Sequence, residues 1–145
     1  LMIRRPPRST QSRSSAASDV YKRQPYKSHG AVVVHSRVAN TGGPGFLCDS
    51  SRVTFADCEA EECGKSEDWQ TYERAGFVLC GELDSNSKVI RSRARGCRYG
   101  FSDRGLGAGI GIKMAVIECD FSGCANAYYF GNPDHQHIIA RNKVP

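Results

Sequence analysis

Five stretches of this chain align as copies of one short unit. They begin near Ala31, Val53, Ser87, Met114 and His137. A column of small residues comprises Ser36, Cys58, Ser92, Cys119 and Asn142. An apolar column three positions earlier comprises Val33, Phe55, Val89, Val116 and Ile139. A repeat of about 22 to 34 residues with matched apolar columns is typical of a solenoid.

Two charged columns flank the column of small residues and support the same register. The first comprises His35, Asp57, Arg91, Glu118 and Arg141. The second comprises Arg37, Glu59, Arg93, Asp120 and Lys143. The second column alternates in sign at every step, and the first does so from Asp57 onward. Equivalent residues of stacked parallel strands lie about 4.8 Å apart, so this alternation predicts two ladders of ion pairs on the outside of the solenoid.

The N-terminal segment needs a separate interpretation. Residues 2–24 have almost no apolar periodicity and are rich in Ser and Arg, and they resemble a translated sequencing-adapter read. Residues 1–24 are therefore predicted to be a non-native, disordered tail. They carry six basic residues and one acidic residue, which accounts for the whole +5 net charge of the chain. Residues 25–145 are then net neutral, which disfavours a nucleic-acid partner.

Residues 25–145 are predicted to form one all-β domain. No run approaches the roughly 18 apolar residues of a membrane span. Strand-type residues recur in short runs, and each unit reads as strand, corner, strand, turn and strand, with Ala56-Asp57 as one such corner. A third strand contains Gly before an aromatic residue, as in Gly76-Phe77 and Gly100-Phe101. An alternative parity, with the apolar corner residues such as Val34 and Ile90 facing inward, is also open.

These columns resemble the repeat of the right-handed parallel β-helix in the pectin-lyase-like superfamily, over about residues 30–144. The resemblance implies a β-helix fragment of about five coils, which stops at Pro145 with an uncapped C-terminus. The superfamily includes polysaccharide lyases, glycoside hydrolases, phage tailspikes and surface adhesins, so the resemblance is specific for fold and poor for function. A tailspike-like member would be a homotrimer.

Seven cysteines occur, at positions 48, 58, 63, 80, 97, 119 and 124. A zinc site would need tight Cys pairs that are absent, and disulfides would need strict geometry between neighbouring coils. Most of these cysteines share columns with Ser, Thr, Ala and Asn, so we expect small, buried, free thiols. This favours a non-oxidising compartment, although the localisation is otherwise unknown. No cofactor is expected.

Two coils carry insertions in which function is expected to lie. The loop 64–75 contains Trp69, Tyr72 and Arg74, which are candidate substrate-binding residues because aromatic faces and guanidinium groups suit sugars. The loop 102–111 contains Asp103 and Arg104, which are candidate catalytic residues. Both loops are expected to flank a groove over the exposed face of the Gly-aromatic strands. The alternative is that Trp69 only holds its loop against the coil.

Enzyme signatures are scarce in this sequence. Only Gly111-Ile112-Lys113 resembles a polygalacturonase-like motif, so catalysis by a lyase or glycoside hydrolase mechanism stays uncertain. His135 and His137 form a His-x-His pair, for which we favour a structural role over a metal site. The sequence leads to a hypothesis of polysaccharide binding or processing on the outer groove. The alternative is a structural or adhesive solenoid without catalysis.

Overall fold

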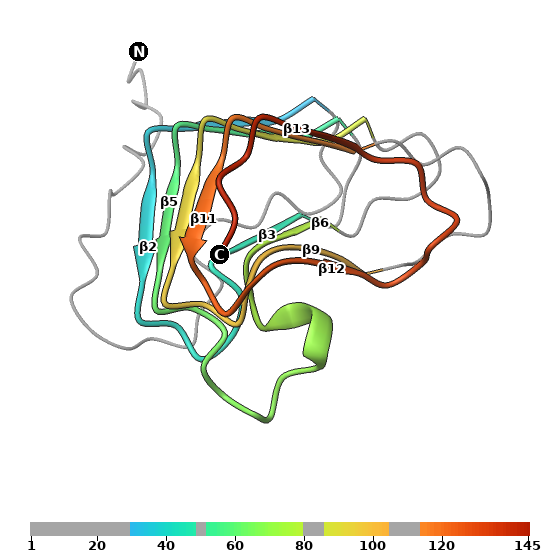
Figure 1. The fold of residues 1–145 in the computed structure, drawn as a ribbon. Coiled ribbons are helices and arrows are strands. Elements are labelled where there is room, and N and C mark those ends of the chain that lie inside the picture. Colours follow the sequence, from blue (N-terminus) through green and yellow to red (C-terminus); the bar gives the residue numbers. More distant parts are fainter. Residues whose placement is uncertain (1–29, 49–51, 80–85, 105–113) are drawn as a thin grey trace, which may run out of the picture.

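The computed structural model describes residues 30–48, 52–79, 86–104 and 114–145, and the predicted tail lies outside them. Three parallel sheets wrap around one interior (Figure 1). The first contains β1 (Val32–Val34), β4 (Thr54–Ala56), β7 (Lys88–Ile90), β10 (Ala115–Ile117) and β13 (Ile138–Ala140). The second contains β2 (Arg37–Ala39), β5 (Glu59–Glu61), β8 (Arg93–Arg95) and β11 (Asp120–Gly123). The third contains β3 (Phe46–Cys48), β6 (Ala75–Leu79), β9 (Tyr99–Asp103) and β12 (Asn126–Phe130).

Each strand pairs in parallel with its counterpart one coil away, which confirms the predicted parallel β-helix. Val33, for example, pairs with Phe55, and Phe55 pairs with Val89. The part of the chain described here has one short 3₁₀ helix, η1 (Thr71–Glu73), on the loop that precedes β6 (Figure 1). None of its helices is long and apolar enough to cross a membrane.

The corner between the first and second sheets depends on one residue with a left-handed backbone. Asp57, Arg91 and Glu118 have φ values of 52°, 44° and 57°, and His35 and Arg141 behave alike. The bend therefore centres on the charged residue itself and not on the Ala56-Asp57 pair. The amide of Asp57 still donates to the carbonyl of Ile90 at 3.1 Å, so the ladder of backbone hydrogen bonds continues around the corner.

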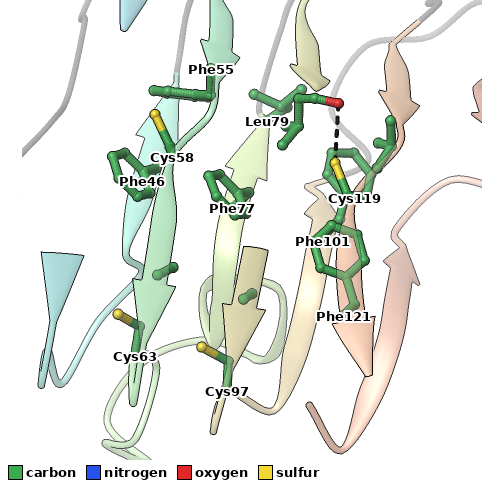
Figure 2. Close-up of a cluster of buried hydrophobic side chains, with 14 of the residues drawn as sticks. Phe46, Phe55, Cys58, Cys63, Phe77, Leu79, Cys97, Phe101, Cys119 and Phe121 are labelled. Carbon is green, nitrogen blue, oxygen red and sulfur yellow. Dashed lines mark hydrogen bonds between the residues drawn. The ribbon is translucent and has the colours of Figure 1, made fainter. Parts of the chain in front are cut away.

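The interior is filled by the predicted apolar columns. Phe55, Val89 and Val116 are fully buried, whereas Val34 is 48% exposed and Ile90 is half-buried, which decides the parity. Figure 2 shows the aromatic side chains of the third sheet stacked along the core. The rings of Phe46 and Phe77 lie parallel, with centroids 5.0 Å apart. Such stacking and burial supply the main stabilisation of the coils.

Glycine in front of each aromatic column makes room for a neighbouring side chain. A Cβ atom on Gly100 would lie 2.3 Å from Cγ of Phe121, and one on Gly76 would lie 2.6 Å from Cβ of Ala94. Both separations are too short for carbon atoms. This confirms that the backbone of the third sheet needs glycine at these positions because the second sheet packs closely against it.

The column of small residues satisfies polar groups at the corners. The Cys58 thiol donates to the carbonyl of Ala56 at 3.3 Å, and the Ser92 hydroxyl donates to that of Ile90 at 2.9 Å. Cys119 makes the same bond to Ile117 at 3.4 Å. Ser and Cys are therefore interchangeable here as small donors to the carbonyl two residues earlier. All six cysteines in the described ranges are buried thiols that form no disulfide, as expected, and Cys80 lies outside those ranges.

The outermost coils expose apolar side chains. In the first coil these are Val32 and Val34. In the last coil they are Phe130, Ile138, Ile139 and Val144. Val32, Val34 and Ile138 lie in outward columns, whereas Ile139 continues the inward column of Phe55 and Val116, so that column is partly exposed at the edge strand β13.

Candidate functional site

The outer surface of the first two sheets carries the predicted charge ladders. Glu59 pairs in register with Arg37 on one side and Arg93 on the other. Asp120 likewise lies between Arg93 and Lys143. A groove of about 430 Å³ runs along the corner between the two ladders, and acidic and basic coils alternate along it. The predicted register is confirmed, and the exterior charges pair largely with one another.

A third set of ion pairs was missed from the sequence. Glu61 binds Arg37 and also Arg95, the latter at 3.1 Å. Hydrogen bonds from these two arginines, Arg37 first, hold the pKa of Glu61 below its usual range. The equivalent positions in the neighbouring coils are Ala39 and Gly123, so no complete charged column marks this ladder in the sequence.

Trp69 is half-buried and holds its loop against the first coil. A Cβ atom on Gly43 would lie 2.7 Å from Cε2 of the indole, so the ring lies directly over this glycine. The amide of Gly64 donates to the carbonyl of Gly43 at 2.7 Å and fixes the start of the same loop. Packing of Trp69 onto the coil accounts for its position without any ligand.

Tyr72 and Arg104 come together from the two insertions. The guanidinium of Arg104 lies 5.3 Å from the centroid of the Tyr72 ring, which is a cation–π contact. Arg74 instead donates from Nε to the carbonyl of Gly64 at 3.4 Å, within its own loop. The structure therefore brings one expected binding residue, Tyr72, into contact with one candidate catalytic residue, Arg104.

The outer face of the third sheet is covered, contrary to the expectation of an exposed groove floor. Leu47 and Val78 pack there with Tyr72 and Tyr99 in a small apolar cluster. Ser102 of β9, which pairs with Val78 of β6, is also fully buried. Tyr72 from the insertion and Tyr99 from β9 therefore cover part of the face over which a polysaccharide groove was expected.

Asp103 lies inside the β-helix and not on the outer surface. It occupies the same core column as Cys48 and Leu79, and it is 1% exposed. Its Oδ2 atom lies 2.7 Å from Nδ1 of His135 and 2.9 Å from Nε2 of His137. The two histidines therefore share one buried carboxylate, which is a polar cluster that we did not foresee from the sequence.

The turn that follows β12 brings the histidines to this carboxylate. The amide of Gly131 donates to the carbonyl of Asp103 at 3.0 Å. The side chain of Asn132 accepts from the amide of Asp134 at 2.9 Å, and its carbonyl accepts from the amide of His135 at 3.3 Å. This Asx turn reverses the chain so that His135 points back into the interior.

The ring of His137 lies between two phenylalanines. Phe130 stacks on it with centroids 5.5 Å apart, and Phe101 meets it edge-on at 6.2 Å. Only 5% of the His137 side chain is exposed. In the hydrogen-bonded arrangement, Nδ1 of His137 has no partner among the described residues. One carboxylate and two imidazoles, with ligand atoms within 4.8 Å of one another, are a donor set that suits a metal ion.

No protein-family model matches the chain, and searches of curated proteins and of solved structures find no match.

Proposed function

We propose that this chain is part of a structural β-solenoid, a rigid scaffold whose outer faces carry no catalytic site. The observation that carries the proposal is the covered outer face of the third sheet, where Leu47, Val78 and Ser102 are all buried. Supporting it, Trp69 packs onto Gly43 and the carboxylate of Asp103 is enclosed in the core. A surface that is already filled by its own side chains offers little area to a polysaccharide.

A second candidate function is polysaccharide binding at the rim formed by Tyr72 and Arg104. The specific observation in its favour is their cation–π contact, which presents a half-buried ring beside a guanidinium. An aromatic face suits a sugar ring, and a guanidinium suits a uronate carboxylate. This rim would bind acidic chains from the side and would not catalyse their cleavage. A tailspike-like homotrimer also stays a prediction.

Calorimetric titration with oligogalacturonate and with a neutral oligosaccharide separates the two functions. The structural proposal expects no saturable heat for either ligand. Saturable binding that weakens in Arg104→Ala but not in Lys88→Ala would contradict it and favour the rim. Lys88 is a suitable control because it is exposed and lies on a different sheet.

A rigid scaffold also makes a positive prediction for amide hydrogen exchange. Each coil contacts mainly its neighbours, so opening should begin at the terminal coils and the middle coils should be protected. We expect slow exchange in β6 and β9 and faster exchange in β1 and β13. Exchange as fast in β6 as in β1 would contradict a rigid scaffold.

A further inference from the structure

We propose that Asp103, His135 and His137 bind one divalent transition-metal ion, of which Zn²⁺ is the probe, and that the ion fastens the last coil to the body of the β-helix. The three residues come from separate parts of the chain: the end of β9, the turn after β12 and the residue before β13. The nitrogens of both rings point at the same carboxylate oxygen, at 2.7 and 2.9 Å. An ion bound there would join three coils.

The chemistry of the donor set selects the kind of ion. Two imidazole nitrogens with one carboxylate oxygen suit Zn²⁺ and similar first-row dications, whereas Ca²⁺ and Mg²⁺ prefer oxygen ligands. Zinc sites built from two histidines and one carboxylate use these three protein ligands and leave one position for water. The hydrogen-bonding distances are shorter than the ligand spacing around an ion, so a small outward movement of the rings would accompany binding.

Burial sets this cluster apart from the ion pairs on the surface. All three side chains are at least nine-tenths buried. The ring of His137 is enclosed between Phe101 and Phe130. Nδ1 of His135 and Nε2 of His137 are the nitrogens that face the carboxylate, so these two atoms would coordinate the ion in place of their hydrogen bonds to Asp103.

The position of the cluster gives the ion a structural role. His137 immediately precedes β13, which is an edge strand with Ile138 and Ile139 exposed. An ion held by Asp103 would therefore oppose fraying of β13 away from β10. The site lies in the interior and shares no residue with the rim of Tyr72 and Arg104. It would therefore bind its ion whether or not that rim binds sugar.

Zinc binding to the full chain tests the proposal. The protein is treated with a chelator, dialysed at neutral pH with a non-thiol reductant, and titrated with Zn²⁺ by calorimetry while thermal unfolding is followed in parallel. We expect about one ion per chain and a higher melting temperature, with no such rise in Ca²⁺ or Mg²⁺.

Matched variants distinguish this site from others on the chain. Asp103→Asn and His137→Gln should each weaken Zn²⁺ binding by more than about tenfold and abolish the thermal shift. His35→Ala removes an exposed histidine, and Cys97→Ala removes a buried thiol, and both should bind as the parent does. Loss of binding only in Cys97→Ala would overturn the proposal in favour of a thiol site.

Co²⁺ provides a readout that does not depend on the folding of variants. Ligation by imidazole and carboxylate should give d–d bands without intense thiolate-to-metal charge transfer. Strong thiolate-to-metal charge transfer would show that the ion binds to cysteine and would contradict this site. A folded parent protein that binds neither Zn²⁺ nor Co²⁺ would show that the cluster is a hydrogen-bond network only.

Discussion

Arg91 binds Asp57 across two adjacent coils through a bidentate ion pair, with Nε 3.0 Å from Oδ1 and Nη2 2.9 Å from Oδ2. Both residues occupy the left-handed corner, where φ is 44° for Arg91 and 52° for Asp57. Their hydrogen bonds hold the pKa of Asp57 below its usual range. The corner that bends the chain thus also carries one rung of a charge ladder.

Reversing one charge of this pair should destabilise the β-helix. Asp57→Arg would place Arg91 beside a like charge, and the melting temperature should fall, by less at high salt because the side chains are exposed to solvent. The double variant Asp57→Arg/Arg91→Asp restores opposite charges and should recover part of the loss. Thermal unfolding of Asp57→Arg, Arg91→Asp and the double variant checks this, and a double variant no better than the sum of its single changes would contradict the pairing.

Adding a methyl group at Gly100 should disturb the contact between the second and third sheets. Its Cβ would lie 2.3 Å from Cγ of Phe121, so Gly100→Ala should cost about 1 to 3 kcal/mol of unfolding free energy. Denaturant unfolding measures the change. In Gly100→Ala/Phe121→Leu the smaller side chain gives room, so the loss should be less than the sum of the two single losses. Additive losses would argue against this contact.

Alkaline pH should weaken the fold through its buried thiols. Burial raises the pKa of Cys119 to about 11, and a hydrogen bond with Cys124, together with burial, raises that of Cys97 to about 12. In the unfolded chain these thiols ionise near pH 8.5. Since the folded state keeps its protons longer, their stabilisation is complete below about pH 8.5 and is lost as the pH rises through the folded-state values.

Denaturant unfolding between about pH 8 and 11 measures this dependence. Each such thiol should lower the unfolding free energy by up to about 1.4 kcal/mol per pH unit in that range. Cys119→Ser is the matched variant, because Ser92 occupies the equivalent position one coil away. The unfolding free energy of this variant should fall less steeply with pH. Equal slopes for the parent and this variant would show that Cys119 does not titrate as described.

Thiol counting should find every cysteine reduced. The six described cysteines form no disulfide, and Cys80 completes the set of seven in the sequence. A thiol reagent should therefore react with seven groups in denaturant without reductant, and more slowly with the buried thiols of the folded protein. A count of one in denaturant would mean three disulfides and would contradict the free-thiol columns.

The solenoid could be predicted because its columns repeat. Phe55 and Val89 share a column in which both are buried, and Glu59 lies between Arg37 and Arg93 as the alternation of sign required. Repetition provides several independent observations of one strand register. A register error of one residue would have reversed the inward and outward faces of every coil.

The cluster at Asp103 could not be predicted for the same reason. The sequence predicts a loop from position 102, but β9 continues through Ser102 and Asp103, so that Ser102 faces outward and Asp103 faces inward. The available signal was an acidic residue in a column that otherwise contains Cys48, Leu79 and Phe130. The turn that carries His135 has no counterpart of known register, so the approach of the histidines needed the structure.

The alternation of charge also bears on how the number of coils could change. Arg37, Glu59 and Arg93 lie in three consecutive coils. Deletion of the coil that carries Glu59 would bring Arg37 next to Arg93, so two like charges would face each other at one strand spacing. Deletion of two consecutive coils would keep the alternation of sign in this column. The ladder therefore favours the gain or loss of coils in pairs.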